Sequence, residues 1–144
     1  MEVGITRIRE DVSLPEYKTG GAACFDIACA DETEIGPGET KYLSTGLVLQ
    51  TPPGHALIMA PRSSIGKSGI ALPNSFGIFD EDYCGPEDEL KIIAKNVTDK
   101  VVKIEKGQRL VQGYFIKVDH VTWKELNVSE IKQNSRGGIG STGK

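Results

Sequence analysis

Apolar and β-branched residues recur along this chain in short runs, each bounded by glycine, proline, asparagine or aspartate. Such punctuation is typical of strands joined by tight turns. No long stretch sustains the 3.6-residue period of an amphipathic helix. We therefore expect an all-β domain, a jelly-roll-like sandwich or barrel of many short strands with little helix. The runs that predict its strands are Thr40–Gln50, Gly54–Ala60, Phe76–Phe79, Leu90–Ala94, Val101–Ile104 and Leu110–Val121.

Two segments that contain proline and glycine, Ile35–Glu39 and Thr51–Gly54, predict tight turns, because proline fixes φ and glycine accepts positive φ. After Trp123 the chain becomes polar and only weakly periodic, and a glycine-rich stretch follows. We therefore expect a β domain over residues 1–123 and an extended C-terminal arm over residues 124–144. A stretched arm of about 20 residues spans roughly 60 Å, farther than such a domain is wide. Its end could then dock on a neighbouring subunit.

The length of 144 residues and the 38% hydrophobic content suit one globular domain with its own core. The 17 basic and 20 acidic residues give a net charge of −3, which lacks the basic excess of proteins whose main partner is a nucleic-acid polymer. No apolar run approaches the ~20 residues that span a bilayer, and the first residues lack a signal peptide's apolar stretch. We expect a cytoplasmic protein that binds neither nucleic acid nor membrane, while a single nucleotide stays a candidate ligand.

Cysteine and histidine are few and scattered. Cys24, Cys29 and Cys84 are odd in number and form no C-x-x-C pair, so neither a disulfide framework nor a thiolate zinc site is indicated. His55 and His120 stand alone, and the H-x-E and P-C-x-x-C motifs of zinc deaminases are absent. We expect free thiols packed in a core, and no metal ion bound directly by side chains.

The last nine residues, Arg136–Lys144, have the composition of a phosphate-binding loop. Their four glycines let backbone N–H groups approach an anion closely, and Arg136 and Lys144 add positive charge. Gly138–Gly143 also matches the dinucleotide motif G-x-G-x-x-G, but that motif works between a strand and a helix, and here the chain ends one residue later. The stretch is therefore either half of a phosphate site completed elsewhere or a polar tail without fixed structure.

The segment Arg62–Ser68 ends like a Walker A loop, with the Gly-Lys-Ser that closes that motif. Pro61 stands where the motif requires its first glycine, which argues against an ATPase. Arg62 still offers a planar fork of donors, and Ser63 and Ser64 offer hydroxyls suited to phosphate oxygens. The plainer alternative is a turn that carries a solvated cation.

The segment Phe76–Tyr83 is an apolar run that ends in three carboxylates and an aromatic ring. If the strand continued to this end, Asp80 and Asp82 would lie on one face, where two like charges raise a pKa and suit a base that activates water. The plainer alternative is a charged turn after the strand.

The segment Lys106–Gly113 places a turn before an apolar strand. In that strand Gln108, Leu110 and Gln112 would share one side. A buried glutamine needs hydrogen-bond partners or a ligand, and this segment alone does not decide between them.

Five segments, taken together and in order, resemble the five motifs of the homotrimeric deoxyuridine triphosphate nucleotidohydrolase (dUTPase) family. Each segment is weakly specific alone, but their order and separations resemble the family across nearly the whole chain. The resemblance implies the β-clip fold of that family, which agrees with the all-β prediction. The five segments are Gly21–Ile27, Ala60–Ser64, Asn74–Gly85, Gly107–Gln112 and Arg136–Gly143.

The resemblance implies an enzyme that hydrolyses dUTP to dUMP and pyrophosphate, with Mg²⁺ carried by the three phosphates and active sites shared between the subunits of a homotrimer. Such a reaction keeps uracil out of DNA and supplies dUMP for dTMP synthesis. By position, Asp80 would be the base that activates water toward the α-phosphorus, and Arg136 would close over the γ-phosphate from another subunit. Asp26 and Arg109 resemble structural rather than catalytic positions of the family.

The same resemblance implies the substrate-binding residues. Tyr83 would lie against the deoxyribose and leave no room for a 2′-hydroxyl, and the hairpin Asn74–Tyr83 would read uracil through backbone groups, too narrow for a thymine methyl. Arg62, Ser63 and Gln112 would hold the phosphates. The full set implied by the family is Arg62, Ser63, Ser64, Asn74, Gly77, Ile78, Tyr83, Gln112, Gly138, Ile139, Gly140 and Ser141.

The chain departs from the usual family pattern at several positions. Ile139 stands where the commonest fifth motif has a phenylalanine that stacks on uracil, and the loss of that stack removes about 1–3 kcal/mol unless another side chain replaces it. A shorter form of the motif resembles this tail. Cys24 replaces a glycine, and Cys84 an arginine or glutamine. The acidic stretch Pro86–Glu89 lengthens the next connection, and we expect it to be a solvated turn.

Two alternative functions stay open at this point. A dCTP deaminase, or a bifunctional deaminase and diphosphatase, shares the fold and a related Arg-Ser-Ser segment. It needs a base at C4 of cytosine, whereas the segment Asp80–Tyr83 favours the α-phosphate. The other alternative is a non-enzymatic trimer that binds a regulatory protein. Such a protein would not need the catalytic residues, yet every matched catalytic position of this chain is filled.

Overall fold

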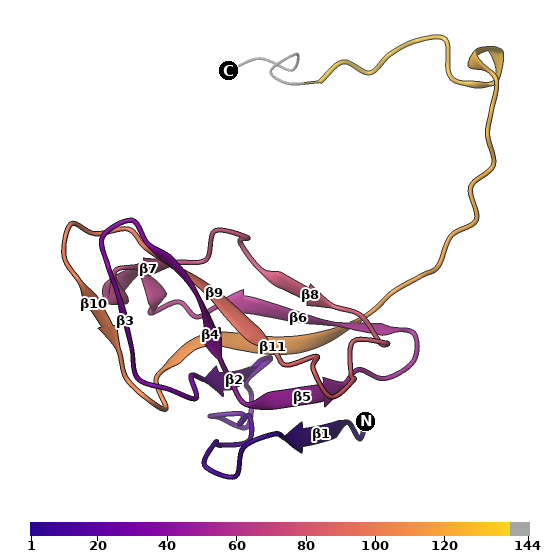
Figure 1. The fold of residues 1–144 in the computed structure, drawn as a ribbon. Helices are drawn as coiled ribbons and strands as arrows, with labels where there is room; N and C mark the ends of the chain where they lie inside the picture. Colours follow the sequence, from indigo (N-terminus) through magenta and orange to yellow (C-terminus); the bar gives the residue numbers. More distant parts are fainter. Residues whose placement is uncertain (139–144) are drawn as a thin grey trace.

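The computed structural model of the chain describes residues 1–138, and Figure 1 shows a body of short strands from which the C-terminal stretch runs away. The described residues contain eleven strands and two short 3₁₀ helices, so the expected all-β fold with little helix is confirmed. The elements are β1 (Gly4–Arg7), β2 (Phe25–Ala28), β3 (Thr33–Ile35), β4 (Thr40–Ser44), β5 (Leu47–Gln50), β6 (His55–Pro61), η1 (Ile65–Ser68), β7 (Ile70–Ala71), β8 (Gly77–Phe79), β9 (Lys91–Asn96), β10 (Val102–Ile104), β11 (Arg109–Lys117) and η2 (Val128–Glu130).

Paired strands run antiparallel throughout the described residues and form four sheets. The largest has the order β2-β11-β6-β8, and the next has the order β4-β9-β7. The two-stranded sheets β1-β5 and β10-β3 complete the body. The longest pairing joins β11 to β6, from Val111 opposite Pro61 to Lys117 opposite His55. Strand β8 forms one edge of the largest sheet.

One apolar core joins the two larger sheets. On β9, Ile92 and Ala94 are buried while Lys91 is exposed, which is the period of two of a half-buried strand. On the largest sheet, Leu57 and Val111 are fully buried and belong to the same cluster. Because an isolated pair of short strands is marginally stable in water, this shared burial is what holds the sheets together.

The two predicted turns lie where proline and glycine occur. In the first, Glu39 N donates to Gly36 O at 3.0 Å, and in the second Gly54 has a φ of 69°. The run Thr40–Gln50, in contrast, divides into β4 and β5, because Gly46 turns the chain with a φ of 67°.

The stretch that follows β11 contains no strand within the described residues, and its one helical element is η2. Residues 119–138 are all exposed, and Trp123 has 90% of its surface accessible. Figure 1 shows this stretch, coloured orange to yellow, leading away from the sheets. The division into a domain and an arm at residue 123 stays a prediction. Among residues 1–138, no helix is long and apolar enough to cross a membrane.

Candidate functional site

A depression of about 500 Å³ lies between the edge strand β8 and the strands β4 and β9. Its lining includes four residues that the sequence predicts to bind base and sugar, so a single chain gathers these candidates. Strands β4 and β9 add side chains that lie in none of the five family-like segments. The four predicted residues are Asn74, Gly77, Ile78 and Tyr83, and the added ones are Tyr42, Lys91 and Ile93.

The turn before β8 is tightly constrained. Asn74 Nδ2 donates to the carbonyl of Phe76 at 3.2 Å. Ser75 has a φ of 63°, a left-handed conformation that serine seldom adopts. A Cβ on Gly77 would lie 2.8 Å from Cε2 of Phe79, so this position needs glycine. Asn74 therefore shapes the wall of the depression through its side chain, and Gly77 does so through its lack of one.

Asp80 begins a turn instead of continuing the strand. Strand β8 ends at Phe79, and Tyr83 N donates to Asp80 O at 3.3 Å, which closes the turn. Asp80 and Asp82 therefore do not share one face of a strand, because the backbone reverses directly after Phe79. The role of Asp80 as a base stays a prediction. Asp80 is exposed and lies in the chain between Phe79 and Tyr83, which both line the depression.

Three contacts hold this turn in place. Glu81 Oε2 accepts a hydrogen bond from Gly54 N at 2.8 Å, which joins the turn to the one before β6. The Tyr83 hydroxyl donates to Glu89 O at 3.2 Å, and its ring packs against Phe79 with the ring centroids 5.7 Å apart. The orientation of Tyr83 is therefore set at both ends of its side chain.

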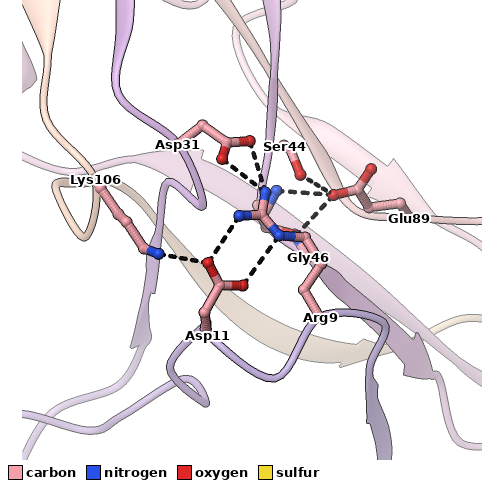
Figure 2. Close-up of polar contacts among 8 residues, drawn as sticks. Arg9, Asp11, Asp31, Ser44, Gly46, Glu89 and Lys106 are labelled. Carbon is pink, nitrogen blue, oxygen red and sulfur yellow. Dashed lines mark hydrogen bonds and ion pairs between the residues drawn. The ribbon is translucent and has the colours of Figure 1, made fainter.

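The acidic connection after Tyr83 is only partly a solvated turn. Glu87 is exposed as expected, and Asp88 Oδ2 accepts a hydrogen bond from Gly85 N at 2.7 Å. Glu89, however, turns toward the β4–β5 turn, where its carboxylate accepts hydrogen bonds from Gly46 and its two preceding neighbours (Figure 2). The sequence contains no local signal of this contact, because the partners are more than 40 residues away.

A second group of predicted residues surrounds Asp26 of β2. Arg62 Nε lies 2.9 Å from Asp26 Oδ1, and Arg109 Nη1 lies 3.5 Å from Asp26 Oδ2. Arg62 Nη1 also donates to Arg109 O at 3.2 Å, and Gln112 Nε2 donates to Pro61 O at 3.1 Å. Asp26 is only 9% exposed, and the two cations offset the cost of burying its charge. The closer pair thus orients the Arg62 guanidinium, whereas Asp26 Oδ2 has no hydrogen-bond partner among the described residues.

The two groups lie at opposite ends of β6. Arg62 follows the last residue of that strand, whereas Asp80 follows Phe79, which pairs with Leu57. Leu57 and Arg62 are five positions apart, so the groups lie roughly 17 Å apart along the strand at about 3.4 Å per residue. A single chain therefore does not bring Asp80 to the candidates for phosphate binding.

The remaining candidates occupy exposed segments. Ser63 and Ser64 are exposed at the start of η1. Arg136 and Gly138 are exposed on the C-terminal stretch that leads away from the sheets (Figure 1). Three further candidates lie outside the described residues, namely Ile139, Gly140 and Ser141.

The three cysteines are free thiols, but only Cys29 is buried, so the expected packing in a core holds for one of them. Burial raises the pKa of the Cys29 thiol to about 12, so it stays protonated at neutral pH. Within residues 1–138, no group of three or more His, Cys, Asp or Glu side chains is placed to hold a metal ion.

Comparison with known proteins decides the family, since the dUTPase family model matches residues 10–143. The chain belongs to the dUTPase family. It is 40% identical over 148 residues to the deoxyuridine 5′-triphosphate nucleotidohydrolase of Hydrogenobaculum sp. (strain Y04AAS1), with 99% of each protein covered. It is 43% identical over 145 residues to the protein of the same name from Histophilus somni (strain 2336), with 96% of this chain and 92% of the relative covered.

Comparison with solved structures also finds a dUTPase fold. The crystal structure of dUTPase from Streptococcus mutans matches with a TM-score of 0.76 at 32% identity and covers 83% of this chain and 99% of that chain. The family resemblance and the β fold expected from the sequence are therefore confirmed. The roles of individual site residues stay predictions.

Proposed function

We propose that this member of the dUTPase family hydrolyses dUTP to dUMP and pyrophosphate, by attack of water on the α-phosphorus. The observation that carries the proposal is the depression beside β8, which joins the predicted base-binding and sugar-binding residues to the turn of Asp80. Two relatives that are 40% and 43% identical to this chain bear the name of this enzyme. These names favour neither a deaminase nor a trimer without activity.

Uracil enters the depression and is read by the backbone of β8. Because β8 is the edge strand of its sheet, one row of its N–H and C=O groups faces no strand of the described residues and is free to bond to a base. The constrained turn at Asn74 and the glycine at position 77 keep the β8 backbone close to the base. The remaining space is then too small for the methyl group of thymine. Tyr83 lies against the deoxyribose, where its ring would collide with a 2′-hydroxyl.

Asp80 orients the attacking water and accepts its proton as the new bond to the α-phosphorus forms and the bond to the bridging oxygen breaks. Arg62, Ser63 and Gln112, with Ser64 beside them, hold the phosphates. Phosphoryl transfer depends mainly on such positioning and on neutralisation of charge. The Asp26 carboxylate supports this role, because it holds the Arg62 guanidinium in place.

Mg²⁺ enters with the substrate. The described residues offer separate carboxylates, such as Asp80 and Asp26, and not a cluster that encloses an ion. This donor set fits a cation coordinated by phosphate oxygens and waters, which is the usual preference of Mg²⁺. When bound, the ion neutralises charge on the triphosphate, while the protein groups orient it.

The complete site is shared between the subunits of a homotrimer. The separation of roughly 17 Å between Asp80 and Arg62 along β6 supports this arrangement, because a neighbouring chain is needed to bring the two groups together. The exposed stretch that carries Arg136 supports a third contribution, in which the tail of another subunit closes over the γ-phosphate.

The test is an assay of the purified protein with Mg²⁺ and equal concentrations of dUTP, dCTP, dTTP and UTP, with the products identified by chromatography. We expect dUTP to give dUMP and pyrophosphate, and the other three nucleotides to be poor substrates. Conversion of dCTP to dUTP or dUMP would replace the proposal with the deaminase alternative. The absence of any turnover by well-folded protein would favour the non-enzymatic alternative.

A further inference from the structure

Glu89 joins the connection between β8 and β9 to the turn between β4 and β5, as Figure 2 shows. Its Oε1 accepts hydrogen bonds from Gly46 N at 2.7 Å and from Thr45 N at 3.1 Å, and the Ser44 hydroxyl donates to the same oxygen. Thr45 is 1% exposed, so its N–H group would be costly to leave without an acceptor. One carboxylate thus satisfies the donors of a whole turn.

The backbone of Glu89 holds Tyr83. The Tyr83 hydroxyl donates to Glu89 O at 3.2 Å, while the ring packs on Phe79. The next residue is also anchored, because Leu90 N donates to Leu47 O at 2.9 Å. The carbonyl that receives the Tyr83 hydroxyl is therefore fixed to the β4–β5 turn through both the side chain of Glu89 and the backbone that follows it.

The β4–β5 turn is itself a fixed support. Ile8 N donates to Gly46 O at 3.0 Å, which joins the turn to the N-terminal segment. Beside it, Arg9 forms ion pairs with Asp11 at 2.9 Å and with Asp31 at 2.7 Å (Figure 2). The Arg9 guanidinium holds the pKa of the Asp11 carboxyl well below its usual range, as a close ion pair does.

We propose that Glu89 is a positioning residue for Tyr83 and thereby sets how strongly the site rejects ribonucleotides. The inference rests on the proposed function, which assigns Tyr83 to the sugar of dUTP. A ring excludes a 2′-hydroxyl only if it cannot retreat, and the 36% exposed Tyr83 is held by Phe79 and Glu89. Without the carboxylate, the connection keeps the backbone bond from Leu90 N to Leu47 O but loses the bonds to Glu89 Oε1, and the ring gains room to move away from the sugar.

The test compares the wild-type protein with Glu89→Ala, Tyr83→Phe and the double variant, each assayed with dUTP and with UTP. The measured quantity is the ratio of kcat/KM for dUTP to kcat/KM for UTP. We expect Glu89→Ala to lower this ratio about fivefold to tenfold, roughly the factor that one hydrogen bond supplies, mainly because UTP becomes a better substrate. In the Tyr83→Phe background, which lacks the hydroxyl, Glu89→Ala should change the ratio less than about twofold.

Two variants serve as controls. Glu87→Ala removes an exposed carboxylate from the same connection and should leave the ratio unchanged. Glu89→Gln keeps an oxygen that can accept from Thr45 and Gly46, so it should restore the ratio to within about twofold of the wild-type value. If Glu89→Ala shows no cooperative melting, Glu89→Asp replaces it in the comparison, because its carboxylate is one methylene shorter and retracts from the turn.

The outcomes separate the inference from the proposed function. If the ratio falls equally in the wild-type and Tyr83→Phe backgrounds, or if only the melting temperature falls, Glu89 supports the fold alone and the inference is overturned. The same holds if Glu87→Ala reproduces the effect. A well-folded wild-type protein that cleaves no dUTP would overturn the proposed function, and the inference with it.

Discussion

Asp80 occupies a turn whose backbone is fixed on both sides. Tyr83 N closes the turn, and the hydrogen bond from Gly54 N to Glu81 attaches it to a neighbouring loop. The Asp80 carboxylate itself is exposed and stays available to a water molecule. Glu81 and Tyr83 hold the backbone of the turn, so the Asp80 side chain is free to contact a water molecule.

Asp80→Asn tests that assignment. The amide keeps the shape of the side chain but cannot take a proton from water, so kcat should fall by about 100-fold to 10,000-fold. Affinity for a non-hydrolysable dUTP analogue should stay within about threefold, because the phosphate contacts remain. Steady-state kinetics and calorimetry measure the two quantities. Asp82→Asn, in the same exposed turn, is the control and should keep nearly full activity; equal losses in both variants would contradict a special role for Asp80.

The turn between β4 and β5 forms hydrogen bonds with two other parts of the chain. Gly46 accepts a hydrogen bond from the N-terminal segment and donates one to Glu89. It adopts a φ of 67°, and a Cβ placed on it would lie 2.7 Å from Cγ1 of Val12. Gly54 has a φ of 69°, but a Cβ there would meet no atom within 4 Å. The two glycines therefore differ in packing and not in backbone conformation.

Gly46→Ala and Gly54→Ala should destabilise the protein by different amounts. The left-handed conformation costs a non-glycine residue about 1–2 kcal/mol, and we expect that cost alone at Gly54. At Gly46 the clash with Val12 adds about 1–3 kcal/mol. Urea unfolding of both variants measures the difference in the free energy of unfolding. If Gly54→Ala were as destabilising as Gly46→Ala, the close approach to Val12 would not be the cause.

Strands could be predicted from the sequence where the signal is local. On β9 the alternation of buried Ile92 and Ala94 with exposed Lys91 appears directly in the residue types. The end of β8 at Phe79 is that of the predicted apolar run, whereas the turn that Asp80 begins could not be predicted, because carboxylates fit the end of a strand and a turn equally well. The contact of Glu89 with Gly46 joins positions 43 residues apart, and only tertiary structure brings them together.

The candidate site was predictable to the extent that it lies within one motif. Asn74 and Tyr83 line the same depression because a single short hairpin carries both. Tyr42 was not predictable as part of it, because it comes from a different sheet. For the same reason, the sequence could not show that Asp80 and Arg62 lie at opposite ends of β6, which is a property of strand register.

For the whole molecule, two features of the single chain support the proposed assembly into a trimer. A single chain leaves Trp123 90% exposed and keeps Asp80 apart from the cationic group around Asp26. If Arg136 stabilises the transition state as proposed, deletion of residues 135–144 should lower kcat/KM for dUTP by about 100-fold or more. The circular dichroism spectrum and the melting temperature should stay close to those of the full chain, because residues 135–138 are exposed.

Mixing two inactive proteins tests whether the tail acts across subunits. The truncated chain keeps Asp80 but lacks Arg136, whereas full-length Asp80→Asn keeps the tail but lacks the base. If the tail closes over a neighbour's substrate, trimers formed by co-refolding the two chains contain some sites with both groups, and part of the activity returns. Each variant refolded alone should stay inactive. If mixed trimers, separated by an affinity tag on one chain, show no recovery, the tail serves its own subunit and the shared site is wrong.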